Sequence, residues 1–253
     1  MTISLAHIYR HPIKSHGSER LETVRLTENQ TLPWDRVWGV AHTDTDIDGS
    51  AWAHCRNFTR GAANPALMAI KATFDDATQQ ITLTHPDLAP LTANPDTDGP
   101  AIIEWVSALA VEGRSGPARV LRAAISADGR GFTDQSDPYI SILNLTSLRV
   151  LSQKAGRDMS PLRFRGNLWV DGAAPWEEFD WLGKRLSLGG AILQVEERID
   201  RCRATEANPD TGKRDTNTLS LLEDGWDHRD FGVFARVVQS GPVTVGDTLK
   251  VLQ

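Results

Sequence analysis

The sequence predicts a mainly β protein (α+β) with a few short helices, built around β-barrel or sandwich units. Short runs rich in β-branched and apolar residues recur from residues 3–9 to residues 241–252. They follow one another closely, without the long helices that would connect parallel strands. A chain of 253 residues can form one large domain or two small ones.

The first half of the chain predicts mostly strands. A hairpin is expected about residues 75–78, and residues 44–49 form an acidic turn. The tract 86–100 is rich in Pro, Asp, Thr and Asn, which is typical of an excursion or a linker. Residues 102–109 carry apolar residues on one helical face. The expected strands are 3–9, 21–26, 34–43, 52–57, 68–74 and 80–85.

The second half predicts one clear helix, at residues 147–155, with Thr146 or Ser147 as its cap and Gly156 beyond its end. A polar loop at 131–138 leads into a strand, residues 224–232 form another loop, and residues 241–252 form a closing hairpin. The remaining expected strands are 118–124, 139–144, 164–170, 191–195 and 233–238.

Composition excludes several classes of function. The formal net charge of −6 argues against nonspecific binding to nucleic acid or to an anionic membrane. We find no signal peptide and no apolar run long enough to cross a bilayer, so we expect a cytoplasmic protein. Two cysteines, Cys55 and Cys202, make neither a structural zinc site nor, in this context, an expected disulfide.

Cys202 lies between Arg201 and Arg203 and is the first candidate for chemistry. Thiolates bind metals and attack electrophiles, and neighbouring guanidinium groups favour the thiolate over the thiol. A small buried cysteine with no chemical role is the alternative. The turn at residues 208–212, Asn-Pro-Asp-Thr-Gly, is ordinary turn chemistry when taken alone.

Taken together, Arg-Cys-x-x-Thr-x-x-x-Pro-Asp-Thr-Gly at 201–212 resembles the molybdenum-ligand segment of the MOSC family. That family includes the amidoxime-reducing component, to which the likeness is strongest, and the C-terminal domain of molybdenum cofactor sulfurase. Four other segments are similar to family motifs in the same order: His-Pro-Ile-Lys-Ser at 11–15, Asp-Arg-Val-Trp at 35–38, Phe-Arg-Gly-Asn at 164–167 and Val-Gly-Asp at 245–247.

The resemblance implies a MOSC N-terminal β-barrel domain at 1–112 packed on a MOSC domain at 113–253. It also implies a molybdenum cofactor (Mo-molybdopterin) with Cys202 as the metal ligand, a soft ligand suited to this metal. A dianionic phosphate in an acidic protein needs concentrated cations. The residues implied to hold the pterin and its phosphate are Lys14, Ser15, Arg36, Arg165 and Asn167, with Arg56 as a weaker addition.

Two positions depart from the family pattern. Asn144 stands where a relative carries Ser, and Phe234 where it carries Tyr, and both are candidates to touch the cofactor. The region 213–230 also differs, so substrate range does not transfer. His228 in that region is a candidate proton donor, with a solvated loop histidine as the alternative.

The resemblance implies an enzyme that reduces N-hydroxylated compounds such as amidoximes and N-hydroxylated bases. The electrons would come from a separate flavin, haem or iron–sulfur protein, because no cysteine-rich segment follows the domain. The alternative is a sulfur-transfer or cofactor-carrier protein with a persulfide on Cys202. A cofactor-free binding module is a third hypothesis.

Overall fold

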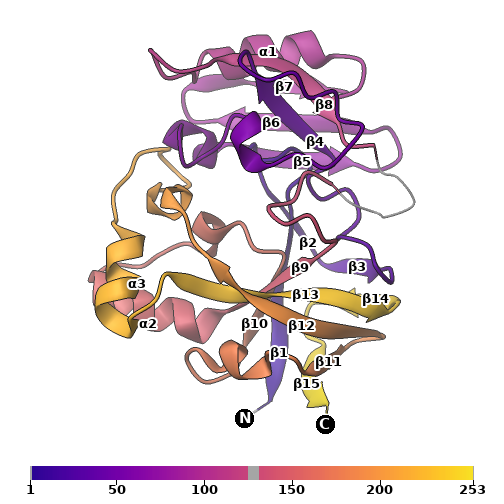
Figure 1. Cartoon of the computed structure of the whole chain (residues 1–253), viewed down its shortest axis with the longest axis vertical. Coiled ribbons are helices and arrows are strands. Elements are labelled where there is room, and N and C mark those ends of the chain that lie inside the picture. Colours follow the sequence, from indigo (N-terminus) through magenta and orange to yellow (C-terminus); the bar gives the residue numbers. More distant parts are fainter. Residues whose placement is uncertain (1, 125–130, 253) are drawn as a thin grey trace.

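The computed structural model describes residues 2–124 and 131–252, which form a mainly β protein with three α-helices (Figure 1). The first strands are β1 (Ile3–Arg10), β2 (Glu19–Leu21), β3 (Thr23–Leu26), β4 (Trp38–His42), β5 (Lys71–Asp75), β6 (Gln80–His85), β7 (Leu88–Ala93) and β8 (Pro117–Arg122). They are followed by β9 (Ile140–Asn144), β10 (Leu168–Asp171), β11 (Arg185–Leu188), β12 (Ala191–Asp200), β13 (Asp230–Gln239), β14 (Gly241–Thr244) and β15 (Thr248–Leu252). The α-helices are α1 (Gly99–Ser107), α2 (Leu145–Ala155) and α3 (Thr218–Trp226).

A closed barrel forms the lower part of the molecule in Figure 1. Seven strands pair in the order β10-β9-β13-β12-β11-β15-β1, and β1 also pairs with β10, which closes the ring. β2 extends the sheet from β1. Inward-facing aliphatic side chains such as Leu5, Ile142, Leu193 and Val233 fill the interior and are fully or almost fully buried.

A smaller unit lies above the barrel in Figure 1 and has its own core. It contains the three-stranded sheet β5-β6-β7, the pair β4-β8, and α1, which packs on β7 and β8. Trp38, Leu67, Ile81 and Ile102 are buried in its core. The expected mainly β fold with two β units and short helices is therefore confirmed.

The chain passes between the two units more than once. β1 belongs to the barrel although it opens the chain, and β3 pairs with β14. β8 pairs with β4 of the smaller unit. The predicted domain boundary between residues 112 and 113 stays a prediction. The predicted domains, 1–112 and 113–253, each include residues that the structure does not describe.

Three predicted elements are wrong, each for a local reason. Residues 55–57 form a 3-10 turn instead of a strand, since the His54 side chain accepts a hydrogen bond from the Arg56 N–H. The expected linker contains β7, an edge strand that tolerates Pro90 because one of its sides has no strand partner. Residues 241–252 are not a hairpin, because β14 pairs with β3 whereas β15 pairs with β1 and β11.

Two helix details also differ from expectation. Asn144, rather than Thr146 or Ser147, caps α2, and its side chain accepts the Thr146 N–H. Gly156 ends α2 in the left-handed conformation, as predicted. The helix α3 occupies a region for which no helix was expected. Among the described residues, no helix has both the length and the apolar character needed to span a membrane.

Candidate functional site

A cavity of about 250 Å³, here called the central cavity, is lined by residues of both units. It brings together distant parts of the chain, namely the loop after β1, the segment before β4, the turn at 55–62, the loop before β9 and the segment after β12. Its polar and sulfur-bearing lining residues are Lys14, Ser15, Arg36, Cys55, Arg60, Met68, Asp134, Ser141, Arg165, Asp200, Arg201 and Cys202.

Cys202 follows the long barrel strand β12 and precedes a 3-10 turn, so a rigid element fixes its position. The residue is exposed and lines the cavity. Burial of the thiol by surrounding protein atoms nevertheless raises its pKa, and Asp134 adds to the rise. The charge of Arg201 lowers the pKa of Cys202, as expected, but the effect of burial is larger. A bound metal cation would reverse this balance by deprotonating the thiol.

The arginines beside Cys202 have other partners. The Arg201 guanidinium donates to the backbone carbonyls of Phe164, at 2.9 Å, and Phe231. Burial lowers the pKa of Arg201 to about 10. Arg203 donates to Glu206 at 3.0 Å. Arg201 thus closes one wall of the cavity as a fixed cation, whereas Arg203 belongs to a surface ion pair.

Three predicted cofactor residues have a left-handed backbone: Ser15 at φ 64°, Arg36 at φ 55° and Arg165 at φ 47°. This conformation is uncommon for residues other than glycine, and it concentrates at functional sites where the surrounding structure enforces it. Arg36 donates to the Asp35 carboxylate and, at 2.8 Å, to the Arg165 carbonyl. The loops that carry the cations are therefore tied directly to each other.

Arg165 fits a site for an anion. Its guanidinium donates to the Gly17 carbonyl at 3.0 Å, but the Nη2 atom is buried without a hydrogen-bond partner among the described residues. Burial, followed by the charge of Arg36, lowers the pKa of Arg165 to about 9. An anionic group in the cavity would satisfy the orphaned donor and relieve this repulsion. The lining, several cations with the soft thiol of Cys202 and a second thiol at Cys55, fits a phosphate-bearing molybdenum cofactor.

Asn167 does not line the central cavity but bonds Ser141, which does. Its backbone N–H donates to the Ser141 hydroxyl at 2.8 Å, and its side-chain oxygen accepts from the same hydroxyl at 2.9 Å. Ser141 lines the central cavity, and Asn167 lines a small adjoining one of about 20 Å³. Phe234 lines both cavities, as expected for a residue that touches a ligand.

The structure places Asn144 and His228 away from the central cavity. Asn144 is fully buried, caps α2, and donates to the Ala174 carbonyl at 2.7 Å and to Glu178 at 2.9 Å. The His228 ring packs edge-on against Trp176 and Phe179, and burial lowers its pKa. The contacts of Asn144 and His228 are therefore with the surrounding fold and not with the central cavity.

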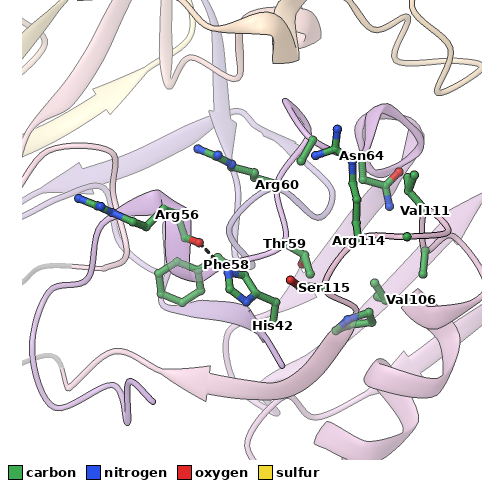
Figure 2. A pocket seen from close by; sticks show the side chains of 14 residues that line it. His42, Arg56, Phe58, Thr59, Arg60, Asn64, Val106, Val111, Arg114 and Ser115 are labelled. Carbon is green, nitrogen blue, oxygen red and sulfur yellow. Dashed lines mark hydrogen bonds between the residues drawn. The ribbon is translucent and has the colours of Figure 1, made fainter. Parts of the chain in front are cut away.

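Arg56 lines a second cavity of about 320 Å³ in the smaller unit, here called the upper cavity. Figure 2 shows its backbone carbonyl facing His42, which contacts it at 2.6 Å, while its guanidinium points away. The weaker prediction for Arg56 thus falls outside the central cavity. Arg60 lines both cavities, and its Nη1 donates to the Cys55 sulfur at 3.4 Å.

Sequence reasoning missed Cys55, Arg60 and Asp134 as residues of the site. Asp134 lies in a loop recognised only as polar, and nothing in the sequence indicates that its carboxylate meets Lys14 120 residues earlier, at 2.5 Å. Cys55 was counted, but the turn that presents it was predicted as a strand. Arg201 was noticed only as a neighbour of Cys202.

Two buried histidines, His11 and His16, should make the stability of the folded protein depend on pH. Burial lowers the pKa of His11 to about 3 and that of His16 to about 4. The unfolded chain binds protons below pH 6.5 and the folded chain does not, so stability falls as the pH drops. We expect the free energy of unfolding to fall by about 2 kcal/mol per histidine between pH 7 and pH 5.

Urea unfolding at several pH values measures this effect. His16→Gln should roughly halve the loss between pH 7 and pH 5, since one of the two imidazoles is removed. A free energy of unfolding that stays constant over this range in the wild type would contradict the assignment of both histidines as neutral.

Comparison with known proteins assigns both parts of the chain. Residues 2–113 match the model of the MOSC N-terminal beta barrel domain, and residues 129–250 match that of the MOSC domain. Molybdenum cofactor sulfurase from Drosophila melanogaster is 27% identical over 234 residues, covering 84% of this chain and 29% of that protein. The Drosophila yakuba protein of the same name is 31% identical over 129 residues, covering 49% and 16%.

The chain therefore spans less than a third of the length of these relatives. Among solved structures, the YUAD protein from Bacillus subtilis is similar with 15% identity and a TM-score of 0.48, covering 99% of this chain and 96% of that one. YiiM from Geobacillus stearothermophilus has 20% identity and a TM-score of 0.35, covering 45% and 54%. The stronger likeness to the amidoxime-reducing component stays a prediction.

Proposed function

The chain belongs to the MOSC-domain family, and on this premise we propose that it is a molybdenum cofactor-dependent reductase of N-hydroxylated compounds. The observation that carries the proposal is the central cavity, where the Cys202 thiol lies with a cluster of cations that includes the unsatisfied buried donor of Arg165. Substrates would be amidoximes and N-hydroxylated bases.

The overall reaction consumes two electrons and two protons: R–NHOH + 2 e⁻ + 2 H⁺ gives R–NH₂ + H₂O. When bound, the cofactor supplies the two-electron chemistry at the N–O bond. The electrons come from a separate redox protein in this proposal.

The residues of the chain bind and orient. Cys202 would ligate the metal, and its place directly after the rigid strand β12 would hold the thiol in position in the cavity. Lys14, Arg36 and Arg165 would hold the phosphate, and Ser141, whose hydroxyl donates to Asn167, would accept a hydrogen bond from the pterin. Burial of these donors strengthens each charge-assisted bond.

The test is an activity assay on protein produced in a cofactor-competent host. Purified protein is supplied with benzamidoxime and reduced methyl viologen as an artificial donor, and formation of benzamidine is followed. We expect turnover that scales with molybdenum content. Protein with stoichiometric molybdenum and no benzamidine formation would contradict the reductase proposal.

A second candidate, sulfur transfer or cofactor carriage, is favoured by one observation. Cys55 lines the same cavity as Cys202, and Arg60 donates to its sulfur, so the site offers two thiols where metal ligation needs one. Sulfur would reside on Cys202 as a persulfide. Mass spectrometry of protein that contains no molybdenum but carries an additional sulfur on Cys202 would support this candidate, and absence of both would support a binding module.

A further inference from the structure

Lys14 and Asp134, which both line the central cavity, form an ion pair. The Lys14 Nζ atom lies 2.5 Å from the Asp134 carboxylate. The Lys14 side chain is 4% exposed, whereas that of Asp134 is 66% exposed. A nearly buried cation, which the proposed function assigns to the cofactor phosphate, thus already has an internal anionic partner.

The Asp134 carboxylate is ionised and faces several cations. The charge of Lys14, followed by those of Arg36 and Arg201, holds its pKa well below the usual range. In the absence of a bound anion, this carboxylate is one of the counter-ions that offset the repulsion among the cations, together with Asp35. An incoming anion would meet both the cations and this negative charge.

The Asp134 side chain is exposed, while hydrogen bonds hold the backbone beside it. Among the described residues, Lys14 is the sole hydrogen-bond partner of the Asp134 side chain. The preceding residue is held on both sides, since the Trp52 indole donates to the Thr133 carbonyl at 3.1 Å and the Thr133 hydroxyl donates to the Gln135 carbonyl at 2.8 Å. A rotation of one exposed side chain would expose Lys14.

We propose that Asp134 is an exchangeable counter-ion, which a phosphate monoester or pyrophosphate-type anion displaces from Lys14. A dianion interacts more strongly with the ammonium group than a single carboxylate does, so the exchange is favourable. Anions of lower charge do not displace Asp134 and are excluded. Asp134 is then a specificity-determining residue for the charge of the ligand. The inference rests on the proposed anion site and not on the redox reaction.

The alternative is that Asp134 permanently positions Lys14. The two roles predict opposite changes in pyrophosphate affinity when the Asp134 carboxylate is removed. Isothermal titration of cofactor-free protein with pyrophosphate at low ionic strength distinguishes them. We expect Asp134→Asn to bind pyrophosphate about tenfold more tightly than the wild type, because the competing charge is gone. Unchanged or weaker binding by this variant, including no detectable binding, would overturn the inference.

Two matched variants separate the effect of the contact from the effect of net charge. Asp200→Asn removes the carboxylate of another residue of the cavity lining, which does not bond Lys14, and we expect a gain in affinity of less than about threefold. An equal gain in pyrophosphate affinity from Asp134→Asn and Asp200→Asn would overturn the inference that the anion displaces Asp134 from Lys14. In a Lys14→Gln background, the gain from Asp134→Asn should disappear, and its persistence would also overturn it.

Thermal unfolding with and without pyrophosphate checks that each variant is folded and should show the larger stabilisation for Asp134→Asn. The result is independent of the proposed reaction. A protein that shows the exchange but neither molybdenum nor benzamidine formation would contradict the reductase alone, and an active molybdenum protein without the exchange would contradict this inference alone.

Discussion

Replacing Cys202 with alanine is expected to lower the molybdenum-dependent reduction of benzamidoxime by about a thousandfold or more. Cys202 follows β12 directly, and this strand fixes the thiol in the cavity that holds the cation cluster. The loss should appear in turnover rather than in substrate affinity, because the thiol would act on the metal and not on the substrate. Steady-state kinetics with an artificial donor measure it.

Cys55→Ala is the matched control, because it removes the other thiol of the same cavity. We expect it to keep most of the activity and the full molybdenum content. Wild-type turnover by Cys202→Ala would show that this thiol is not the ligand, and equal losses in both variants would move the account toward a two-thiol sulfur chemistry.

Asp35→Asn is expected to lower the free energy of unfolding by about 3 kcal/mol or more and to weaken cofactor retention. Asp35 is 1% exposed and accepts the His11 N–H at 2.8 Å and a bond from the Arg36 guanidinium. The substitution leaves Arg36 without its carboxylate partner inside the protein. Since Arg36 in turn holds the Arg165 carbonyl, both cofactor-binding arginines lose their fixed positions.

Urea unfolding at pH 7 and metal content measure the two effects. Asp180→Asn, on the exposed surface, should change stability by less than about 0.5 kcal/mol. Arg36 and the His11 bonds hold the pKa of Asp35 well below its usual range, against the effect of burial. Its stabilisation is therefore complete above about pH 4 and is lost as the pH falls below that value. Wild-type stability of Asp35→Asn at pH 7 would contradict this role.

The sequence could predict the architecture because strand patterns are local. Runs such as 80–85 alternate buried and partly buried residues, and the structure has a strand at those residues. The partners of the last two strands could not be predicted, because β14 and β15 pair with strands more than 50 residues away. β7 was hidden by Pro90, which only an edge position tolerates.

The sequence could predict the site residues whose side chains, cationic or thiol, have the chemistry that the cofactor requires. Lys14, Arg36, Arg165 and Cys202 do meet in one cavity. Asn144 was a candidate because a relative carries Ser at that position, but a helix cap and a buried carboxylate use its amide. The left-handed backbone of Arg36 and Arg165 and the pairing of Lys14 with Asp134 depend on tertiary contacts, so no local pattern reveals them.

The most direct test of the account is the molybdenum and pterin content of the protein after purification from a cofactor-competent host. We expect about one molybdenum and one pterin per chain, with both reduced by Arg165→Gln, which removes the cation with the unsatisfied donor. Protein that carries neither molybdenum nor pterin, although the host supplies the cofactor to a known molybdenum enzyme, would contradict it.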